Sequence, residues 1–267
     1  IPGLGIVLLV IFLVLVGWLF SAKRRQINWR TVMGALALQL IIAIAVIYVP
    51  GVREVFRFMG EAFVKVLNYS EEGSRFLFGH LVGNVGLYDG EGNPVQQYQV
   101  LSDGKQLLSI FAFKILPTII FFSALSSILY YFRVIQFFVY IFAWLMTRTL
   151  KLSGAESLSA AGNIFLGQTE SPLLIKGYLE KMTKSEINLV MVGGMATVAG
   201  GVLAIYVSLL GKGDVELEKV FAQHFITASV MAAPGAVVMA KLLFPQAEKV
   251  DTSIQIPRDK IGNNFLS

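Results

Sequence analysis

The residues best suited to bind a polar solute lie within residues 151–182, a segment more polar than the apolar runs around it. Its centre reads Gly167-Gln168-Thr169-Glu170-Ser171-Pro172. The side chains of Gln168 and Thr169 can donate and accept hydrogen bonds, whereas the carboxylate of Glu170 only accepts them. Because an ionised group is costly to hold at membrane depth, Glu170 is a functional candidate if this segment enters a membrane.

A second unusual segment is rich in glycine and lies within the apolar run of residues 187–211. Its glycines form two pairs, Gly193-Gly194 and Gly200-Gly201. Small residues allow neighbouring helices to approach closely. Alternatively, the glycines flank a stretch that unwinds and frees backbone carbonyls for a cation. From the local pattern alone we favour close packing.

Other kinds of chemistry find little support. The chain contains no cysteine, so it has no disulfide and no cysteine-based metal site. Neither His80 nor His224 pairs obviously with Glu170, which disfavours an enzyme that uses this carboxylate as an acid or base. The net charge of +5 does not indicate nucleic-acid binding, because the basic residues flank apolar runs.

These candidates belong to a chain with the composition of a membrane protein. Hydrophobic residues make up 55% of its 267 residues and charged residues only 15%, against about 25% charged in soluble domains. Residues 1–22, 31–49 and 187–211 are uncharged, and each run reaches the roughly 20 residues that a membrane-spanning helix needs. The sequence therefore predicts an all-α polytopic membrane protein with transmembrane and interfacial helices.

The expected topology has five spans, at residues 1–22, 31–49, 106–132, 187–211 and 221–244. The loop after the first span carries four basic residues and no acidic one. By the positive-inside rule this loop is cytoplasmic, which places the N-terminus outside and the C-terminus inside.

The segments between the spans differ in character. Residues 52–67 combine helical apolar spacing with a charged opposite face, which predicts an amphipathic interfacial helix. We expect an extracellular connection at 68–104, an interfacial or protein-packed helix at 134–147 and a short charged loop at 212–219. The expected divisions are 1–50 (two spans), 51–105 (interfacial helix and connection), 106–150 (third span and second interfacial helix), 151–186 (hairpin), 187–211 (fourth span) and 212–267 (fifth span and polar tail).

Residues 151–186 are predicted to form two short helical pieces on either side of the polar tip. Pro172 suits the first turn of the second piece, and its N-terminus has capping candidates in Thr169, Glu170 and Ser171. Thr183 and Glu186 form a capping-box pattern that starts the next span. We interpret the segment as a re-entrant hairpin, whose helix ends face a ligand. The alternative is a cytoplasmic loop between two interfacial helices, with Glu170 in water.

Two stretches together resemble a known family. Residues 163–175 read Asn-Ile-Phe-Leu-Gly-Gln-Thr-Glu-Ser-Pro-Leu-Leu-Ile, and residues 193–202 read Gly-Gly-Met-Ala-Thr-Val-Ala-Gly-Gly-Val. Both resemble the concentrative nucleoside transporters, as does the order of the predicted elements along the whole chain. The resemblance implies the first part of an inverted-repeat transporter with a broken fourth span. The family's second repeat, which binds the ribose, is absent from this chain.

The resemblance also implies a binding site. Its nucleobase ligands correspond to Gln168, Thr169, Glu170 and Val202. An amide and a hydroxyl can pair with the edge of a base, a carboxylate needs a donor or a bridging water, and a valine supplies apolar contact. The coupling sodium ion corresponds to the Asn163 side chain, the Leu166 and Val198 carbonyls, and the Thr197 hydroxyl or carbonyl. Such an all-oxygen shell suits a hard cation.

The implied function is sodium-coupled symport of nucleosides such as uridine across a bacterial inner membrane. Alternating access by an elevator-like movement, a homotrimer in contact with membrane lipid, and no cofactor beyond sodium follow from the same resemblance. One alternative is another ion-coupled transporter of a polar solute with a re-entrant hairpin. A second alternative is a proton-coupled nucleoside transporter, because such relatives exist in the family, although Asn163 favours sodium.

Overall fold

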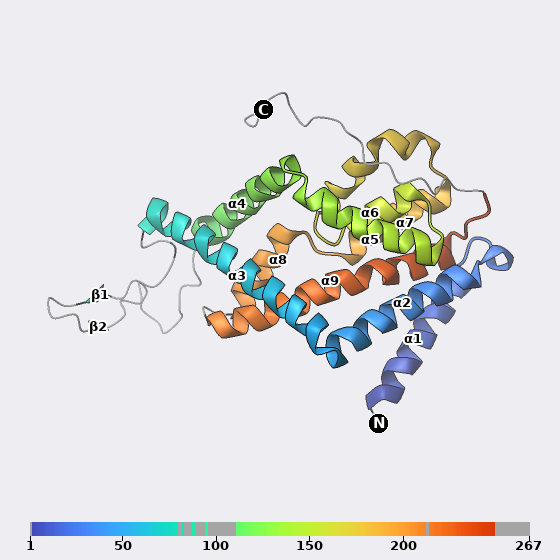
Figure 1. The fold of residues 1–267 in the computed structure, drawn as a ribbon, viewed down its shortest axis with the longest axis horizontal. Helices are drawn as coiled ribbons and strands as arrows, with labels where there is room; N and C mark the ends of the chain where they lie inside the picture. The colour runs from blue at the N-terminus through green and yellow to red at the C-terminus, as the bar shows by residue number, and fades with distance from the viewer. Residues whose placement is uncertain are drawn as a thin grey trace. The chain divides into compact units, whose positions relative to one another are not determined.

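The computed structural model describes residues 2–79, 82, 87–88, 94–95, 111–211 and 214–248. Helices dominate this part of the chain, as expected for the all-α class (Figure 1). In chain order the elements are α1 (Pro2–Leu19), η1 (Arg24–Gln26), α2 (Trp29–Tyr48), α3 (Pro50–Phe78), β1 (Leu87–Tyr88), β2 (Pro94–Val95), α4 (Phe111–Tyr131), α5 (Val134–Leu150), α6 (Gly154–Gly162), η3 (Ser171–Lys181), α7 (Lys184–Ala196), α8 (Gly200–Gly211) and α9 (Val215–Leu243). Strands β1 and β2 pair antiparallel, with Leu87 opposite Val95.

The described residues group into two compact units. The first unit is built from residues 2–56, 128–200 and 224–248, and the second from residues 57–127 and 201–223. Helices α3, α4 and α9 each contribute to both units. The hairpin segment and the end of α7 both belong to the first unit.

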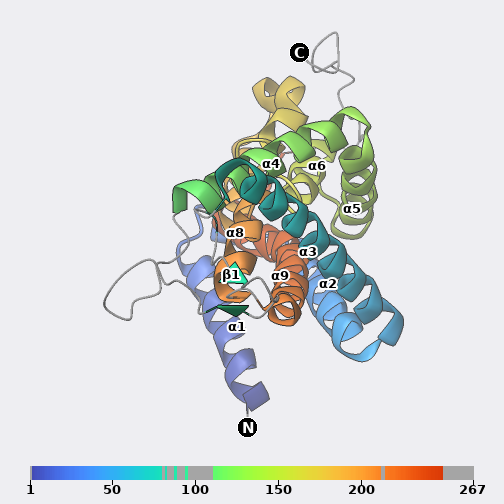
Figure 2. The ribbon, with the colours of Figure 1, turned by 90° about the vertical axis from the view of Figure 1, so that its left-hand side faces the viewer.

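The largest hydrophobic cluster of the first unit joins α2, α5 and the part of α9 that follows residue 224 (Figures 1 and 2). Val32 of α2, Leu150 of α5 and Val237 of α9 are buried in it. The Thr31 hydroxyl donates a hydrogen bond of 3.4 Å to the Leu150 carbonyl, which fastens the start of α2 to the end of α5. This cluster supports the helices that hold the candidate site.

A second cluster lies between α5 and the hairpin segment. Ile135, Val139 and Ala143 recur every fourth residue on the buried face of α5, as an amphipathic helix requires. They pack with Leu158 of α6 and Leu174 of η3, among others. One face of α5 is therefore packed against the hairpin segment.

The second unit brings together α3, α4, α8 and the beginning of α9. The rings of Phe63 and Phe122 lie 5.1 Å apart, centroid to centroid. A Cβ on Gly201 would meet the Phe122 side chain at 3.7 Å, and one on Gly60 would meet the backbone of Gln223 at 3.0 Å. Gly60 thus allows α3 to approach the backbone of α9 closely.

Within the described residues, three helical stretches are long and apolar enough to cross a membrane: Trp29–Tyr48, Lys184–Gly211 and Val215–Leu243. A fourth is counted if α4 and α5, separated by a bend, are taken together as one span. Two other spans were expected. The span at residues 1–22 corresponds to α1, whose apolar stretch Leu8–Leu19 is shorter than a full span. The span at residues 106–132 corresponds to α4, which begins at Phe111 in the described part of the chain.

Two boundaries differ from expectation. Helix α3 continues to Phe78, so residues 68–78 are helical and do not start the connection; most of the remaining connection lies outside the described residues. Small Ser70 and Ser74 occupy the buried face there, which hides the helical period from a search for apolar residues.

Helix α9 starts at Val215, so residues 215–219 are helical and not a loop. The Asp214 carboxylate caps this helix start, because it accepts hydrogen bonds from the backbone N–H groups of residues 216 and 217 at 2.9 and 3.3 Å.

Candidate functional site

The hairpin segment starts with a capped helix. The Ser153 hydroxyl accepts a hydrogen bond from the Glu156 N–H at 3.1 Å, and the Glu156 carboxylate accepts one from the Ser153 N–H at 3.2 Å. This reciprocal capping box satisfies two N–H groups that a helix start leaves unpaired. Every residue of α6 is buried, so the helix is held inside the protein although it has only 9 residues.

The chain returns along α6 as η3, a 3-10 helix of 11 residues with Pro172 in its first turn. The two expected helical pieces are thus confirmed. The Ser171 hydroxyl donates to the Ser159 carbonyl at 2.8 Å and so ties the pieces together. Gly162 allows their close approach, because a Cβ there would lie 2.8 Å from side-chain atoms of Leu174 and Ser171.

The tip between the two pieces exposes three polar side chains, those of Gln168, Thr169 and Glu170. The Gly167 carbonyl accepts hydrogen bonds from the N–H groups of Glu170 and Ser171 at 3.1 and 3.0 Å, which closes the turn. Glu170 is the N-cap residue of η3, yet no capping hydrogen bond is formed by its side chain. Its carboxylate is therefore not used to cap the helix.

The expected span at residues 187–211 is broken into α7 and α8. Residues 197–199 are not helical, and Thr197 has an extended backbone with φ −121° and ψ 162°. The Thr197 hydroxyl donates to the Gly193 carbonyl at 3.0 Å. Both alternatives for the glycine-rich segment therefore apply. The helix unwinds between the two glycine pairs, and the first pair packs against the hairpin.

Asn163, the C-cap residue of α6, is the least satisfied polar group near this break. Its side chain is 1% exposed, and neither the amide oxygen nor the amide nitrogen has a hydrogen-bond partner among the described residues. Leaving a buried polar group unpaired costs about 1–3 kcal/mol. A Cβ on Gly193 would lie 2.9 Å from the Asn163 amide nitrogen, so this amide lies against the last turn of α7.

The hairpin tip also lies against the broken helix. A Cβ on Gly194 would be 3.0 Å from the Gln168 Cβ, and one on Gly167 would be 3.2 Å from the Ala199 Cβ. The first unit therefore brings Asn163 and Gln168 next to the end of α7 and its break, where Thr197 and Val198 lie. Val202 belongs to the second unit, in α8, where its side chain is 40% exposed.

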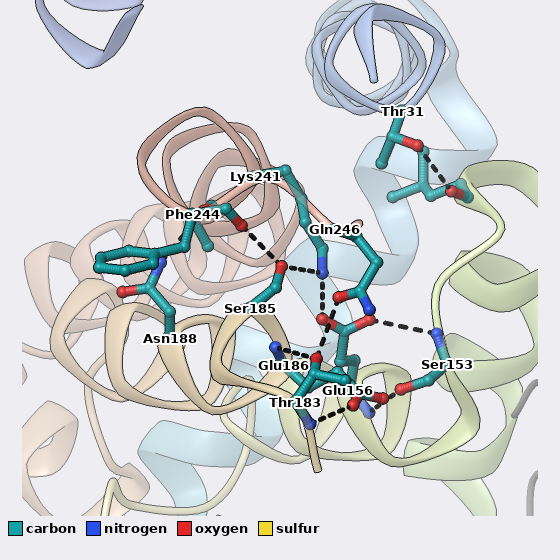
Figure 3. A network of polar contacts seen from close by, with 12 residues as sticks. Thr31, Ser153, Glu156, Thr183, Ser185, Glu186, Asn188, Lys241, Phe244 and Gln246 are labelled. Atoms are coloured by element: carbon teal, nitrogen blue, oxygen red, sulfur yellow. Dashed lines mark hydrogen bonds and ion pairs between the residues drawn. The ribbon is translucent and has the colours of Figure 1, made fainter. Parts of the chain in front are cut away.

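A buried ion pair at the base of the hairpin escaped the sequence reasoning (Figure 3). The Lys241 ammonium of α9 pairs with the Glu156 carboxylate and donates to the Ser185 hydroxyl at 3.0 Å. The two charged side chains are only 5% and 1% exposed. Intramembrane charges usually pair with an opposite charge. Lys241 stands alone in an apolar run, which indicates that it has a buried acidic partner elsewhere.

Further polar contacts join the start of α7 to the end of α9 (Figure 3). The Ser185 hydroxyl donates to the Phe244 carbonyl at 2.6 Å, and the Asn188 amide donates to the Ala240 carbonyl at 3.1 Å. The predicted capping box is confirmed, with hydrogen bonds of 3.3 and 2.7 Å between Thr183 and Glu186. One polar network thus holds the starts of α6 and α7 against α9.

Family models match the two main parts of the chain. One, described as Na+ dependent nucleoside transporter N-terminus, matches residues 8–81. Another, described as Nucleoside recognition, matches residues 112–213, which include the hairpin tip and the break.

Named relatives are similar over most of this chain. Nucleoside permease NupC of Helicobacter pylori is 38% identical over 251 residues, which cover 94% of this chain and 54% of the permease. Sodium/nucleoside cotransporter 1 of Mus musculus is 38% identical over 239 residues, which cover 90% of this chain and 32% of the cotransporter. The chain thus spans about half the length of the bacterial permease. These relatives are named as a permease and a cotransporter rather than as enzymes.

Solved structures of CNTnw have the same fold. The structure in an inward-facing substrate-bound state matches with a TM-score of 0.79 at 36% identity, covering 96% of this chain and 57% of that chain. A double variant of CNTnw in an outward-facing state matches with a TM-score of 0.75 at 37% identity, covering 91% and 53%. The fold of this chain is therefore shared with a little over half of the CNTnw chain.

Proposed function

We infer that this chain, which belongs to the concentrative nucleoside transporter family, carries the nucleobase and cation sites of a sodium-coupled nucleoside symporter. Both family models and both relatives named above support a nucleoside as the substrate, and one family model and the mouse cotransporter support sodium as the coupling ion. The observation that carries the cation site in this chain is the buried, unpaired amide of Asn163 beside the end of α7.

The surroundings of Asn163 favour a cation. Asn163 is the C-cap residue of α6 and lies against the last turn of α7, so the C-terminal ends of two helices meet near it. Helix C-termini carry partial negative charge and unpaired carbonyl oxygens. The proposed sodium ligands are the Asn163 amide oxygen, the Leu166 and Val198 carbonyls, and the Thr197 hydroxyl or carbonyl. Oxygen atoms of this kind suit a hard cation, and the Asn163 amide cannot take a proton in its place.

The proposed nucleobase site is the exposed tip. Gln168 and Thr169 offer donors and acceptors to the edge of a base, and Glu170 accepts a hydrogen bond from the base or from a bridging water. Val202, at the start of α8 in the second unit, is proposed as a base ligand on the family resemblance alone. The tip lies against residues of α7 and its break, so the proposed base and cation sites are neighbours in the first unit.

The proposed transport cycle is an elevator-like movement of a re-entrant hairpin within a homotrimer. Solved structures of CNTnw in inward-facing, intermediate and outward-facing states support alternating access. A bacterial inner membrane, with lipid around the helices, is the proposed location, because NupC and a second relative come from Helicobacter pylori and Haemophilus influenzae. Uridine is the proposed test substrate.

Asn163→Ala tests the cation site. The substitution removes the amide oxygen, so we expect sodium affinity to fall on the order of tenfold, as for the loss of one charge-assisted contact. The measurement is sodium binding to the purified full-length protein without nucleoside. Uridine binding at saturating sodium provides the control, because it shows that the hairpin still folds. Wild-type sodium affinity in this variant would remove Asn163 from the site.

A further inference from the structure

We propose that the adjacent glycines Gly193 and Gly194 are positioning residues with separate tasks, one for the cation and one for the nucleobase. Gly193 leaves room for the Asn163 amide, and Gly194 leaves room for the backbone of the tip at Gln168. The inference rests on the proposed function, and it assigns to two neighbouring residues of α7 the control of two different ligands.

Gly193 controls the space available to Asn163. A Cβ at this position would lie 2.9 Å from the Asn163 amide nitrogen, which is closer than the contact distance of carbon and nitrogen. The Asn163 side chain is buried and has no hydrogen-bond partner to hold it elsewhere among the described residues. An added methyl group would therefore displace the same amide that is proposed to bind sodium.

Gly194 meets a different part of the hairpin. A Cβ here would lie 3.0 Å from the Gln168 Cβ and 3.6 Å from its Cα. These atoms are fixed to the backbone and cannot rotate away as the end of a side chain can. A methyl group on Gly194 would therefore shift the tip itself by a few tenths of an ångström, together with the polar groups that it presents.

The separation of the two tasks follows from helix geometry. Consecutive residues of an α-helix point about 100° apart, so two adjacent glycines face different neighbours. Glycine in a helix costs about 1 kcal/mol relative to alanine, so two in succession are costly unless the missing side chains serve a purpose. Gly193 meets the polar amide of Asn163, whereas Gly194 meets the Cβ and Cα atoms of Gln168, so the two glycines make room for different parts of the hairpin.

The test uses Gly193→Ala and Gly194→Ala in the full-length protein. Sodium binding is measured without nucleoside, and uridine binding is measured at saturating sodium. We expect Gly193→Ala to weaken sodium binding on the order of tenfold and to leave uridine affinity within about twofold. Gly194→Ala should give the reverse pattern. Gly177→Ala is the matched control, because no atom beyond the neighbouring backbone lies within 4 Å of its added Cβ, and it should change neither affinity.

A double variant separates positioning from general damage to the helix. In the Asn163→Ala background the amide is gone, so Gly193→Ala should cause no further loss of sodium affinity. If Gly193→Ala alone fails to fold, the double variant, which has room for the added methyl group, should fold and bind uridine as Asn163→Ala does. Failure of the double variant to fold would contradict the inference.

Other outcomes overturn the inference in distinguishable ways. Equal weakening of both ligands by both glycine variants, or additive losses of sodium affinity in the double variant, would show a structural effect only. Unchanged affinities in both variants would also refute it. If the wild-type protein bound neither sodium nor uridine, the proposed function would fail, and the inference would fail with it.

Discussion

At the scale of single residues, two polar side chains of the candidate site do not serve to hold the fold together. The Asn163 amide is buried without a partner, and the Glu170 carboxylate is exposed at the tip without capping η3. The unpaired Asn163 amide costs free energy because it is buried, and a helix start without a side-chain cap forgoes the stability that a cap would add. Both are better explained as binding groups, the first for a cation and the second for a base.

Glu170→Gln tests the second of these assignments. The substitution keeps the volume of the side chain but replaces one acceptor oxygen with a donor. We expect uridine affinity at saturating sodium to fall by roughly 5- to 150-fold, the equivalent of about 1–3 kcal/mol. Thermal stability should stay at the wild-type level, because the carboxylate forms no capping hydrogen bond. Wild-type uridine affinity in folded protein would refute the role of Glu170.

At the scale of elements, the sequence predicted most of what lies close together along the chain. The short pieces around the tip, Pro172 in the first turn of η3 and the capping box at Thr183 are local patterns, and all are confirmed. Contacts between distant residues were not predictable in the same way. Nothing along the chain indicates that Lys241 pairs with Glu156, because 85 residues separate them.

The Lys241–Glu156 pair fastens the hairpin base to α9 and predicts a large effect on stability. Lys241→Met leaves Glu156 as a buried charge without its partner, which should cost about 3–5 kcal/mol. The measurement is the thermal unfolding midpoint in detergent. Because a buried ion pair can often be replaced by uncharged groups at little cost, the double variant Glu156→Gln/Lys241→Met should regain most of the loss.

The matched control for this prediction is Lys176→Met, since Lys176 is exposed on η3. An exposed lysine contributes little to stability, so this midpoint should stay near the wild-type value. A Lys241→Met protein as stable as the Lys176→Met protein would show that the buried pair does not hold the hairpin base.

At the scale of the whole molecule, composition and apolar runs were sufficient to predict an all-α membrane protein. The exact extent of the helices was harder to predict. Helix α3 continues beyond its apolar stripe because buried serines replace larger residues, and α9 begins with a charged turn that resembles a loop. The break at Thr197 could not be chosen over simple packing from glycine content alone. The position of the break depends on contacts between α7 and the hairpin, which are distant in the sequence.

We propose that the full-length protein couples nucleoside movement to sodium. The most direct test is uptake of labelled uridine by the full-length protein in proteoliposomes under an inward sodium gradient. We expect uridine to accumulate above its external concentration. Replacing sodium with potassium, with or without a proton gradient, should abolish this accumulation. Equal accumulation without sodium, or accumulation driven by protons alone, would contradict the claim.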